Sequence, residues 1–323
     1  MNIKMKDRVA MNYINTLHEG ENISEIYFCK NKTVAKTKAG KTYYSLILQD
    51  KTGTLDAKIW DLGSGIDHFE SKEYIYVDGQ ITIFNDAKQL NIRRVRRAMD
   101  GEYDEADYMP CSPKNNNDMY NELLTLIDRV KEEHLNALLK EFFINDKAFV
   151  EVFRRQSAAK SIHHGFIGGL MHHSISVAKL CNFYCDNYPV INRDLLITAA
   201  LLHDIGKTKE LSPFPENDYT DEGQLVGHIV IGAMMVRDKA DNIEGFPTKI
   251  KDELVHCILS HHGKMEYGSP KTPALIEAQA LAYADDTDAK LETFSELLEE
   301  NSDKTGWLGY NRLLESNVKH TEM

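Results

Sequence analysis

The sequence has no long hydrophobic run and few cysteines. No stretch of about eighteen apolar residues, the length that a membrane helix needs, occurs in its 323 residues, and the charges at positions 4 to 8 are not followed by an apolar segment. We therefore expect neither a membrane span nor a secretory signal. The five cysteines are odd in number and widely scattered, which is typical of reduced thiols and predicts a cytoplasmic protein.

Other patterns are missing as well. The sequence has no internal repeat and no Cys2His2 spacing, and the latter argues against a closed structural zinc site. Basic residues are in deficit overall, with a formal net charge of −12. Residues 1–100 nevertheless hold 16 Lys and Arg against 13 Asp and Glu, whereas the remainder holds 22 against 37. This asymmetry predicts two domains with different tasks.

Residues 1–100 alternate apolar and polar side chains in short runs separated by turn signals. The pattern predicts five strands, at 23–38, 43–49, 54–60, 74–84 and 89–93, with a short helix from Gly65 to Phe69. Five strands with a helix after the third is the order of an OB-fold barrel, which binds oligonucleotides on one face. The run from Tyr44 to Trp60 resembles the strand–turn–strand pattern of the nucleic-acid-binding OB family.

A single strand of nucleic acid requires cations along its backbone and aromatic faces for its bases. Basic and aromatic side chains of this domain are candidates for both roles. They are Lys30, Lys32, Lys36, Lys38, Lys41, Arg93 and Arg94, with Tyr43 and Trp60 as stacking residues. The alternative interpretation is that the lysines form a solvated edge and that the aromatic residues belong to the core.

Residues 101–117 are acidic and contain proline and asparagine, so we expect a linker there. From residue 118 the apolar period becomes 3.6, which predicts an all-α bundle over 118–300 with a helical lead-in at 118–154. We expect residues 301–323 to dock on this bundle or on another subunit of a homo-oligomer.

In the predicted bundle, histidines and aspartates occur where apolar helices begin or end. An apolar helix runs into His203-Asp204 and stops at Gly206, and His228 and His261-His262 occupy similar positions. Side chains at such positions can converge at one end of a helical bundle. Imidazole and carboxylate together suit a catalytic site for a divalent cation.

These motifs resemble the HD-domain metal-dependent phosphohydrolases. H-D-I-G-K at 203–207, H-H-G-F-I-G-G-L-M-H-H-S at 163–174, L-S-H-H-G at 259–263 and E-A-Q-A-L-A-Y-A-D-D-T-D-A-K at 277–290 are most similar to YhaM-type 3′→5′ exoribonucleases, which pair an OB fold with an HD domain. The resemblance implies the metal ligands His173, His203, Asp204, His228, His261, His262 and Asp285.

The resemblance also implies further roles. Asp204 would be catalytic as well as a ligand, Lys207 would neutralise phosphate charge, and His164 would contact substrate. Related sequences often have Glu where this one has His172, so we do not count that position as a ligand. Asp286 and Asp288 are expected to face solvent or to orient their neighbours.

The resemblance implies a divalent cofactor, with two ions favoured; Mn is expected first, with Mg, Co, Fe or Zn as alternatives. Two cations that share Asp204 would lower the pKa of a water between them and stabilise the phosphoryl oxygens. The leading hypothesis is an exoribonuclease that releases nucleoside 5′-monophosphates from single-stranded RNA, or from single-stranded DNA. The alternatives are a hydrolase of nucleotides or cyclic dinucleotides, and a non-catalytic single-strand-binding factor.

Overall fold

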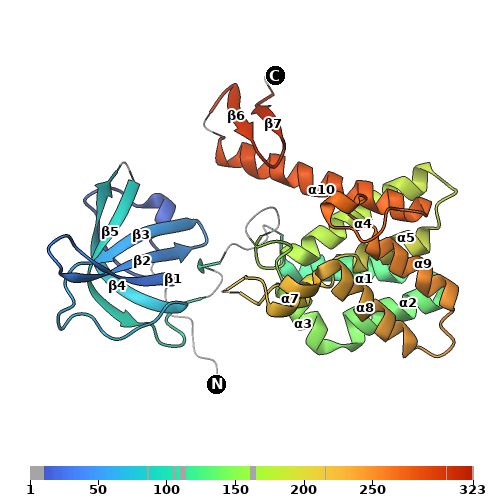
Figure 1. Ribbon diagram of the computed structural model, residues 1–323, viewed down its shortest axis with the longest axis horizontal. Helices are drawn as coiled ribbons and strands as arrows, with labels where there is room; N and C mark the ends of the chain where they lie inside the picture. The colour runs from blue at the N-terminus through green and yellow to red at the C-terminus, as the bar shows by residue number, and fades with distance from the viewer. Residues whose placement is uncertain are drawn as a thin grey trace. The chain divides into compact units, whose positions relative to one another are not determined.

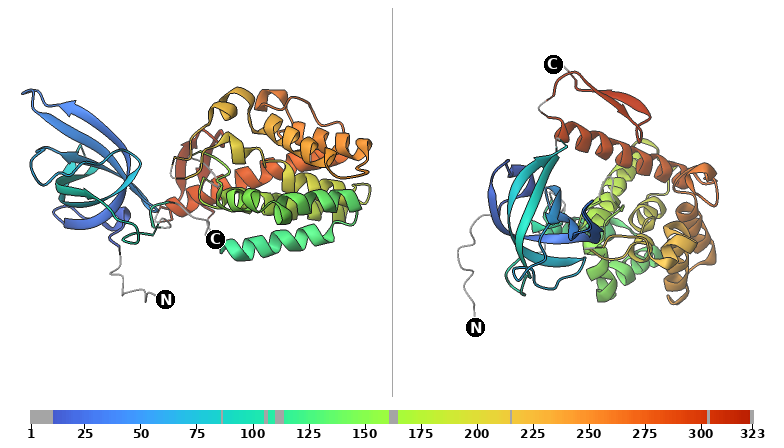
Figure 2. Two further views of the ribbon diagram at one scale, coloured as in Figure 1. Left: turned by 90° about the horizontal axis from the view of Figure 1, so that it is seen from below. Right: turned by 60° about the vertical axis from the view of Figure 1, so that its left-hand side comes forward.

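The structure, a computed structural model, describes residues 11–85, 87–104, 107–109, 114–160, 165–214, 216–302 and 304–321. The chain divides into two compact units, Met1–Cys111 and Ser112–Met323 (Figures 1 and 2). The first unit is built from strands and the second mainly from helices, and each is described by itself below. None of the described helices is both long enough and apolar enough to cross a membrane.

The first unit is a closed five-stranded barrel in the order β1-β2-β3-β5-β4. The strands are β1 (Asn22–Lys36), β2 (Thr42–Asp50), β3 (Gly53–Ile59), β4 (Glu73–Phe84) and β5 (Ala87–Arg97), preceded by the short 3-10 turn η1 (Ile14–Thr16). β3 and β5 pair in parallel and the other neighbours pair antiparallel. This topology, followed by helices, confirms the predicted class of an all-β OB-fold barrel and an all-α bundle.

The alternating pattern of the sequence fills the barrel. Leu46 and Leu48 of β2 and Leu55, Ala57 and Ile59 of β3 are all buried, while the residues between them face outward. Successive side chains of a strand point to opposite faces, so every second residue enters the core. The barrel core is therefore determined by the pattern that predicted the strands.

The predicted helix from Gly65 to Phe69 is wrong. Ile66 instead forms an isolated parallel bridge with Val95 of β5, and the amide of Asp67 donates to the carbonyl oxygen of Val95 over 3.0 Å. A stretch of five residues is too short to stabilise a helical nucleus by itself. Pairing with β5 and burial of the Phe69 ring determine its conformation.

The described part of the predicted linker, residues 101–117, differs from a free connection. Tyr108 is buried, and the Tyr103 ring stacks on Tyr74 of β4 with centroids 3.9 Å apart. The amide of Lys51 donates to the carbonyl oxygen of Asp107 over 3.0 Å. The segment therefore packs on the barrel as far as Met109, because its apolar and aromatic side chains outweigh its acidic composition.

The second unit contains ten described helices. They are α1 (Asn116–Arg129), α2 (Glu133–Lys140), α3 (Lys147–Arg155), α4 (Gly169–Asn187), α5 (Arg193–Leu202), α6 (Lys207–Glu210), α7 (Asp221–Val226), α8 (His228–Asp241), α9 (Thr248–Leu259) and α10 (Ile276–Glu300). The π-helical turn η3 (Glu141–Asn145) follows α2, and the 3-10 turn η4 (Met265–Tyr267) follows α9.

α4 and α5 form the centre of this unit. All residues of α5 from Leu195 to Leu202 are buried, and α4 buries residues on all sides of its first half. A helix that is apolar all round requires other helices around it. α5 begins where the Asn192 side chain accepts the amide of Leu195 and ends at His203, so its burial carries His203 and Asp204 into the interior.

After α10 the chain forms an antiparallel hairpin of β6 (Trp307–Asn311) and β7 (Ser316–Lys319), seen at the end of α10 in Figure 1. The Nε2 atom of His320 lies 3.0 Å from the carbonyl oxygen of Asn301, which ties the hairpin to the end of the helix. This hairpin occupies the segment for which we predicted docking.

A close approach of backbones in the barrel gives a stability prediction. A Cβ atom at Gly79 of β4 would lie 2.5 Å from the carbonyl oxygen of Asn91 in β5, whereas at Gly63 the nearest atom would be 4.0 Å away. We expect Gly79→Ala to destabilise the barrel by roughly 1–3 kcal/mol through overpacking. Urea unfolding measures this, with Gly63→Ala as the matched control; equal stabilities would contradict the close approach.

Candidate metal centre

The candidate centre is built around the carboxylate of Asp204. His203 and Asp204 are 0% and 1% exposed, directly after the buried helix α5. The Nζ atom of Lys207, on the first residue of α6, lies 2.6 Å from Asp204 Oδ2. A carboxylate so far from water is stable only if charges or hydrogen bonds compensate it.

Gly206 makes the turn after Asp204 compatible with the neighbouring helix α8. A Cβ atom on Gly206 would lie 2.0 Å from the carbonyl oxygen of His228 and 2.7 Å from the amide nitrogen of Gly232. Only a glycine therefore allows the start of α8 to approach this turn. The contact brings His228, which follows 24 residues after Asp204, to the same place in the fold.

One side of Asp204 faces His173, His203 and Asp285. The Nε2 atom of His173 lies 3.5 Å from Asp204 Oδ2, 3.2 Å from His203 Nε2 and 3.1 Å from Asp285 Oδ1. The distance from His203 Nε2 to Asp285 Oδ1 is 3.7 Å. α4, the end of α5 and α10 thus bring one donor atom each to a single point.

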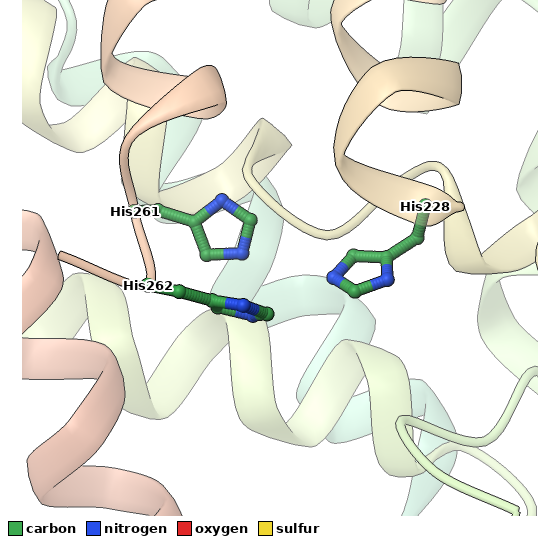
Figure 3. Close-up of side chains that lie close together, drawn as sticks. All are labelled: His228, His261 and His262. Atoms are coloured by element: carbon green, nitrogen blue, oxygen red, sulfur yellow. The ribbon is translucent and has the colours of Figure 1, made fainter. Parts of the chain in front are cut away.

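The other side of Asp204 faces His228, His261 and His262. The Nε2 atoms of His228 and His261 each lie 3.5 Å from Asp204 Oδ1. One nitrogen from each of the three rings falls within 4.8 Å of the other two. Figure 3 shows these rings converging from the start of α8 and from the segment after α9. Asp204 therefore has donors at both of its oxygens, and the two sets adjoin, since His203, His261 and Asp285 also bring one atom each within 4.8 Å of one another.

The five histidine rings of the centre are oriented in the same way, because the Nδ1 atom of each ring contacts an oxygen. The Nδ1 contacts are His203 to Ala200 O (2.8 Å), His261 to Ile258 O (2.7 Å), His262 to Tyr267 O (2.8 Å), His228 to Glu210 Oε1 (2.9 Å) and His173 to Asp288 Oδ2 (2.7 Å). Carbonyl and carboxylate oxygens only accept, so Nδ1 is the donor and a neutral ring keeps its Nε2 lone pair for the centre.

Two further carboxylates orient rings of this set: Glu210, which was not predicted, and Asp288, which was expected to face solvent or to orient its neighbours. Glu210 Oε1 accepts both from the ring of His228 and from its backbone amide, over 2.9 and 3.0 Å. Asp288 follows Asp285 by three residues on α10, and this helical spacing would have pointed to it. No spacing marks Glu210, because the segment 211–227, which includes α7, returns the chain so that His228 meets the end of α6.

Charges inside the cluster change its proton affinities. Burial would raise the pKa of Asp204, but the Lys207 ammonium and His203 outweigh it and hold this pKa well below its usual range. Burial would lower the pKa of His203, but the carboxylates of Asp204 and Asp285 raise it to about 10. Burial dominates at His261 and lowers its pKa. In the metal-free protein, the carboxylates of Asp204 and Asp285 thus have positively charged groups beside them.

The residues fit a divalent cation. Among the residues that the structure describes, Asp204 Oδ1, His228 Nε2 and His261 Nε2 are buried and have no hydrogen-bond partner. Buried polar atoms are almost always paired, so three such atoms around one point indicate a missing partner. Imidazole nitrogen with carboxylate oxygen is a donor set typical of Mn, Fe, Co or Zn. Coordination requires Nε2 without its proton, so affinity should fall as the pH is lowered.

His172 and Asp286, which we did not count as ligands, have partners outside the donor set. The Nε2 atom of His172 is 2.6 Å from Lys114 Nζ, and the ring lies beside Phe166. Asp286 is half exposed and pairs with Lys290 over 2.8 Å. His164 lies outside the described residues.

In the barrel, the predicted nucleic-acid residues fall into separate groups. Lys30, Lys36, Lys38 and Lys41 are exposed on β1 and on the loop to β2. Lys32 differs: its side chain is 11% exposed and its ammonium lies over the rings of Tyr44 and Phe69, so it stabilises the barrel itself.

Arg93 and Arg94 lie on β5. The guanidinium of Arg93 donates to Asn22 Oδ1 over 3.0 Å, and Arg94 Nε is 3.8 Å from Asp78 Oδ2. Both residues are exposed. They therefore remain available to a ligand at the surface of this strand, which lies between β3 and β4.

The two predicted stacking residues lie against each other. The rings of Tyr43 and Trp60 stack with centroids 4.5 Å apart, and Trp60 remains 43% exposed. The indole N–H of Trp60 donates to Asn91 Oδ1 over 2.8 Å, which fixes the ring beside β5. The pair thus presents an oriented aromatic surface on the outside of β2 and β3.

Residues 170–290 match the HD domain family. With the barrel that precedes it, this match defines a class: an OB-fold barrel followed by an HD domain that depends on divalent metal. The relatives of this chain include proteins named 3′-5′ exoribonuclease YhaM. The protein from Listeria welshimeri is 35% identical over 86% of this chain and 88% of its own length. The proteins from Bacillus velezensis and a Geobacillus species are each 34% identical, over 88% and 87% of this chain and 90% and 86% of their own lengths. The chain belongs to the YhaM family.

Among solved structures, the second OB-fold domain of replication protein A from Methanococcus maripaludis aligns at 14% identity with a TM-score of 0.23. The alignment covers 29% of this chain and 100% of that domain. A score in this range supports no inference, and the barrel topology alone identifies the OB fold.

Glu210 gives a prediction about metal affinity. Replacing it with glutamine removes the charge that holds the Nδ1 proton of His228, so we expect the metal-free protein to bind Mn²⁺ roughly 10- to 100-fold more weakly. Isothermal titration calorimetry measures the affinity. Asp286→Asn is the matched control, because this carboxylate lies beside Asp285 in the chain but faces solvent. Equal affinities for wild type and Glu210→Gln would disprove the role of Glu210.

Proposed function

We propose that this protein is a metal-dependent exoribonuclease that hydrolyses single-stranded RNA from the 3′ end. The observation that carries the proposal is the convergence of His173, His203, Asp204, His228, His261, His262 and Asp285 from five helix ends or helices onto one buried point. Membership of the YhaM family supports the substrate and the polarity, since the curated relatives are named for both.

In this proposal the centre holds two cations that share Asp204. His173, His203 and Asp285 would bind one through the side of Asp204 Oδ2, and His228, His261 and His262 would bind the other through Oδ1. The unpaired atoms on the Oδ1 side support the second site, because no described residue offers them a hydrogen bond. We propose Mn²⁺, with Mg²⁺, Co²⁺, Fe²⁺ and Zn²⁺ as the alternatives to be compared.

When bound, such cations lower the pKa of a coordinated water and stabilise the charge on phosphoryl oxygens. The protein supplies position and charge. Asp204 joins the two donor groups, and Lys207, 2.6 Å from it, places an ammonium at the same point, where it can neutralise phosphate. His164 remains a proposed substrate contact. The products would be nucleoside 5′-monophosphates.

The barrel would hold the single strand before it reaches the centre. The oriented Tyr43–Trp60 pair supports base stacking, and the exposed Lys30, Lys36, Lys38 and Lys41 with Arg93 and Arg94 support backbone contacts. Single-stranded DNA presents the same bases and phosphates, so it is a second substrate to test.

The centre is tested by Asp204→Asn. This change keeps the shape of the side chain but removes the charge between the two donor groups, so we expect RNA degradation to fall by at least about 100-fold. The measurement is a product analysis of uniformly labelled RNA and DNA with each of the five cations. Undiminished degradation by Asp204→Asn would refute the assignment of the centre, and products other than 5′-mononucleotides would refute the proposed reaction.

The barrel surface is tested by Trp60→Ala. Loss of one stacking face is worth roughly 1–3 kcal/mol, so we expect KM for a long RNA to rise about fivefold or more while hydrolysis of a dinucleotide is unchanged. Tyr188→Ala, which removes an exposed ring at the end of α4, is the control. An unchanged KM for long RNA would remove Trp60 from the interface.

A further inference from the structure

The proposed ligands of the metal centre are not equally buried. Four of the seven are buried, and three remain partly exposed: His228, His262 and Asp285. A substrate phosphate must approach through the part of the centre that solvent reaches. The open side of the centre therefore lies at these three residues, and a bound nucleotide first meets the side chains next to them.

Exposed apolar side chains lie on both chain segments that carry the partly exposed rings. One pair ends α7 and is separated from His228 by a single glycine, and the other pair belongs to the 3-10 turn η4, which begins three residues after His262. These four exposed residues, called the rim below, are Leu225, Val226, Met265 and Tyr267. Apolar groups that remain exposed beside a few converging polar groups are typical of a ligand site.

The backbone of Tyr267 is held against the ring of His262. Its carbonyl oxygen accepts from the Nδ1 atom of this ligand over 2.8 Å, and its amide donates to the carbonyl oxygen of Lys264 over 3.1 Å. Gly263 and Gly268 enclose the turn with φ values of +76° and +92°, which favour glycine. Tyr267 is therefore one hydrogen bond away from a proposed metal ligand.

One face of the Tyr267 ring has a cation beside it. The ammonium of Lys264 lies 5.1 Å from the ring centroid and pairs with Glu266 over 3.2 Å. A cation over one face of a ring leaves the opposite face for a planar group. A nucleobase is such a group, since every base has a π-face that stacks on an aromatic side chain.

We propose that the rim binds the 3′-terminal base of RNA and that Tyr267 stacks on this base. The proposal rests on the exoribonuclease function. In a nucleotide the ribose separates the base from the phosphate, so a terminal phosphodiester at the centre places its base beside the centre, where the rim lies. Stacking accepts all four bases, so the rim holds the end of the strand without restricting its sequence.

The test compares hydrolysis of two dinucleotides by the full chain, one complete and one whose 3′ nucleoside lacks its base. For wild type we expect KM to be about fivefold or more higher without the base, at similar kcat, because one stacking contact is lost. Tyr267→Ala should show the higher KM with both substrates, which isolates the contact between ring and base. Tyr267→Phe keeps the ring and should resemble wild type. Tyr188→Ala should do so too, because it removes a ring of the same exposure, 58%, at the end of α4.

Metal binding gives a control that does not depend on turnover. The contact with His262 is made by the backbone of Tyr267, so Tyr267→Ala should bind Mn²⁺ with wild-type affinity in isothermal titration calorimetry. A weaker affinity would make Tyr267 a support of His262 and would overturn the proposal.

The outcomes separate this proposal from the one on which it rests. If wild type hydrolyses neither dinucleotides nor long RNA, the proposed function itself fails. If wild type degrades RNA but loss of the base changes KM equally in wild type and Tyr267→Ala, stacking on Tyr267 is refuted while the exoribonuclease function stands. A wild-type KM that is the same with and without the base would refute the rim as a base-binding site.

Discussion

The centre of the second unit depends on one buried carboxylate. Asp204 is 1% exposed, so it requires positive charge beside it. Lys207 and His203 supply that charge at Oδ2 in the metal-free protein, and divalent cations would supply it at both oxygens when bound. The same requirement explains why helices from distant parts of the sequence end at this point, because only their side chains and ends bring polar groups into an apolar bundle.

The sequence was sufficient for the parts of the protein that follow a regular pattern. Alternation over β2 and β3 predicted the barrel, and the order of barrel and bundle was confirmed. The pattern placed histidines and aspartates where apolar runs begin or end, and the resemblance to HD-domain proteins selected the seven proposed ligands among them. The structure brings these seven together; their binding of metal stays a prediction.

The sequence was insufficient where tertiary contacts determine the conformation of a segment or the position of a side chain. The stretch from Gly65 to Phe69 pairs with β5 instead of forming a helix, and residues up to Met109 pack on the barrel despite their acidic composition. Lys32 was grouped with its exposed neighbours although its ammonium lies over two rings of the barrel. Glu210 could not be predicted from the sequence, because its contact with His228 depends on the path of residues 211–227, which no local pattern determines.

The Nδ1 bonds of His203 and His261 have a further consequence. Each ring donates to a carbonyl oxygen three residues earlier, in the last turn of its own helix. Carbonyls in the last turn of a helix lack the amide that would follow four residues later in a continued helix, so these ring contacts help to satisfy them. Occupancy of the centre should therefore reduce fraying at the carboxyl ends of α5 and α9, and amide hydrogen exchange there would report ligand binding without any measurement of turnover.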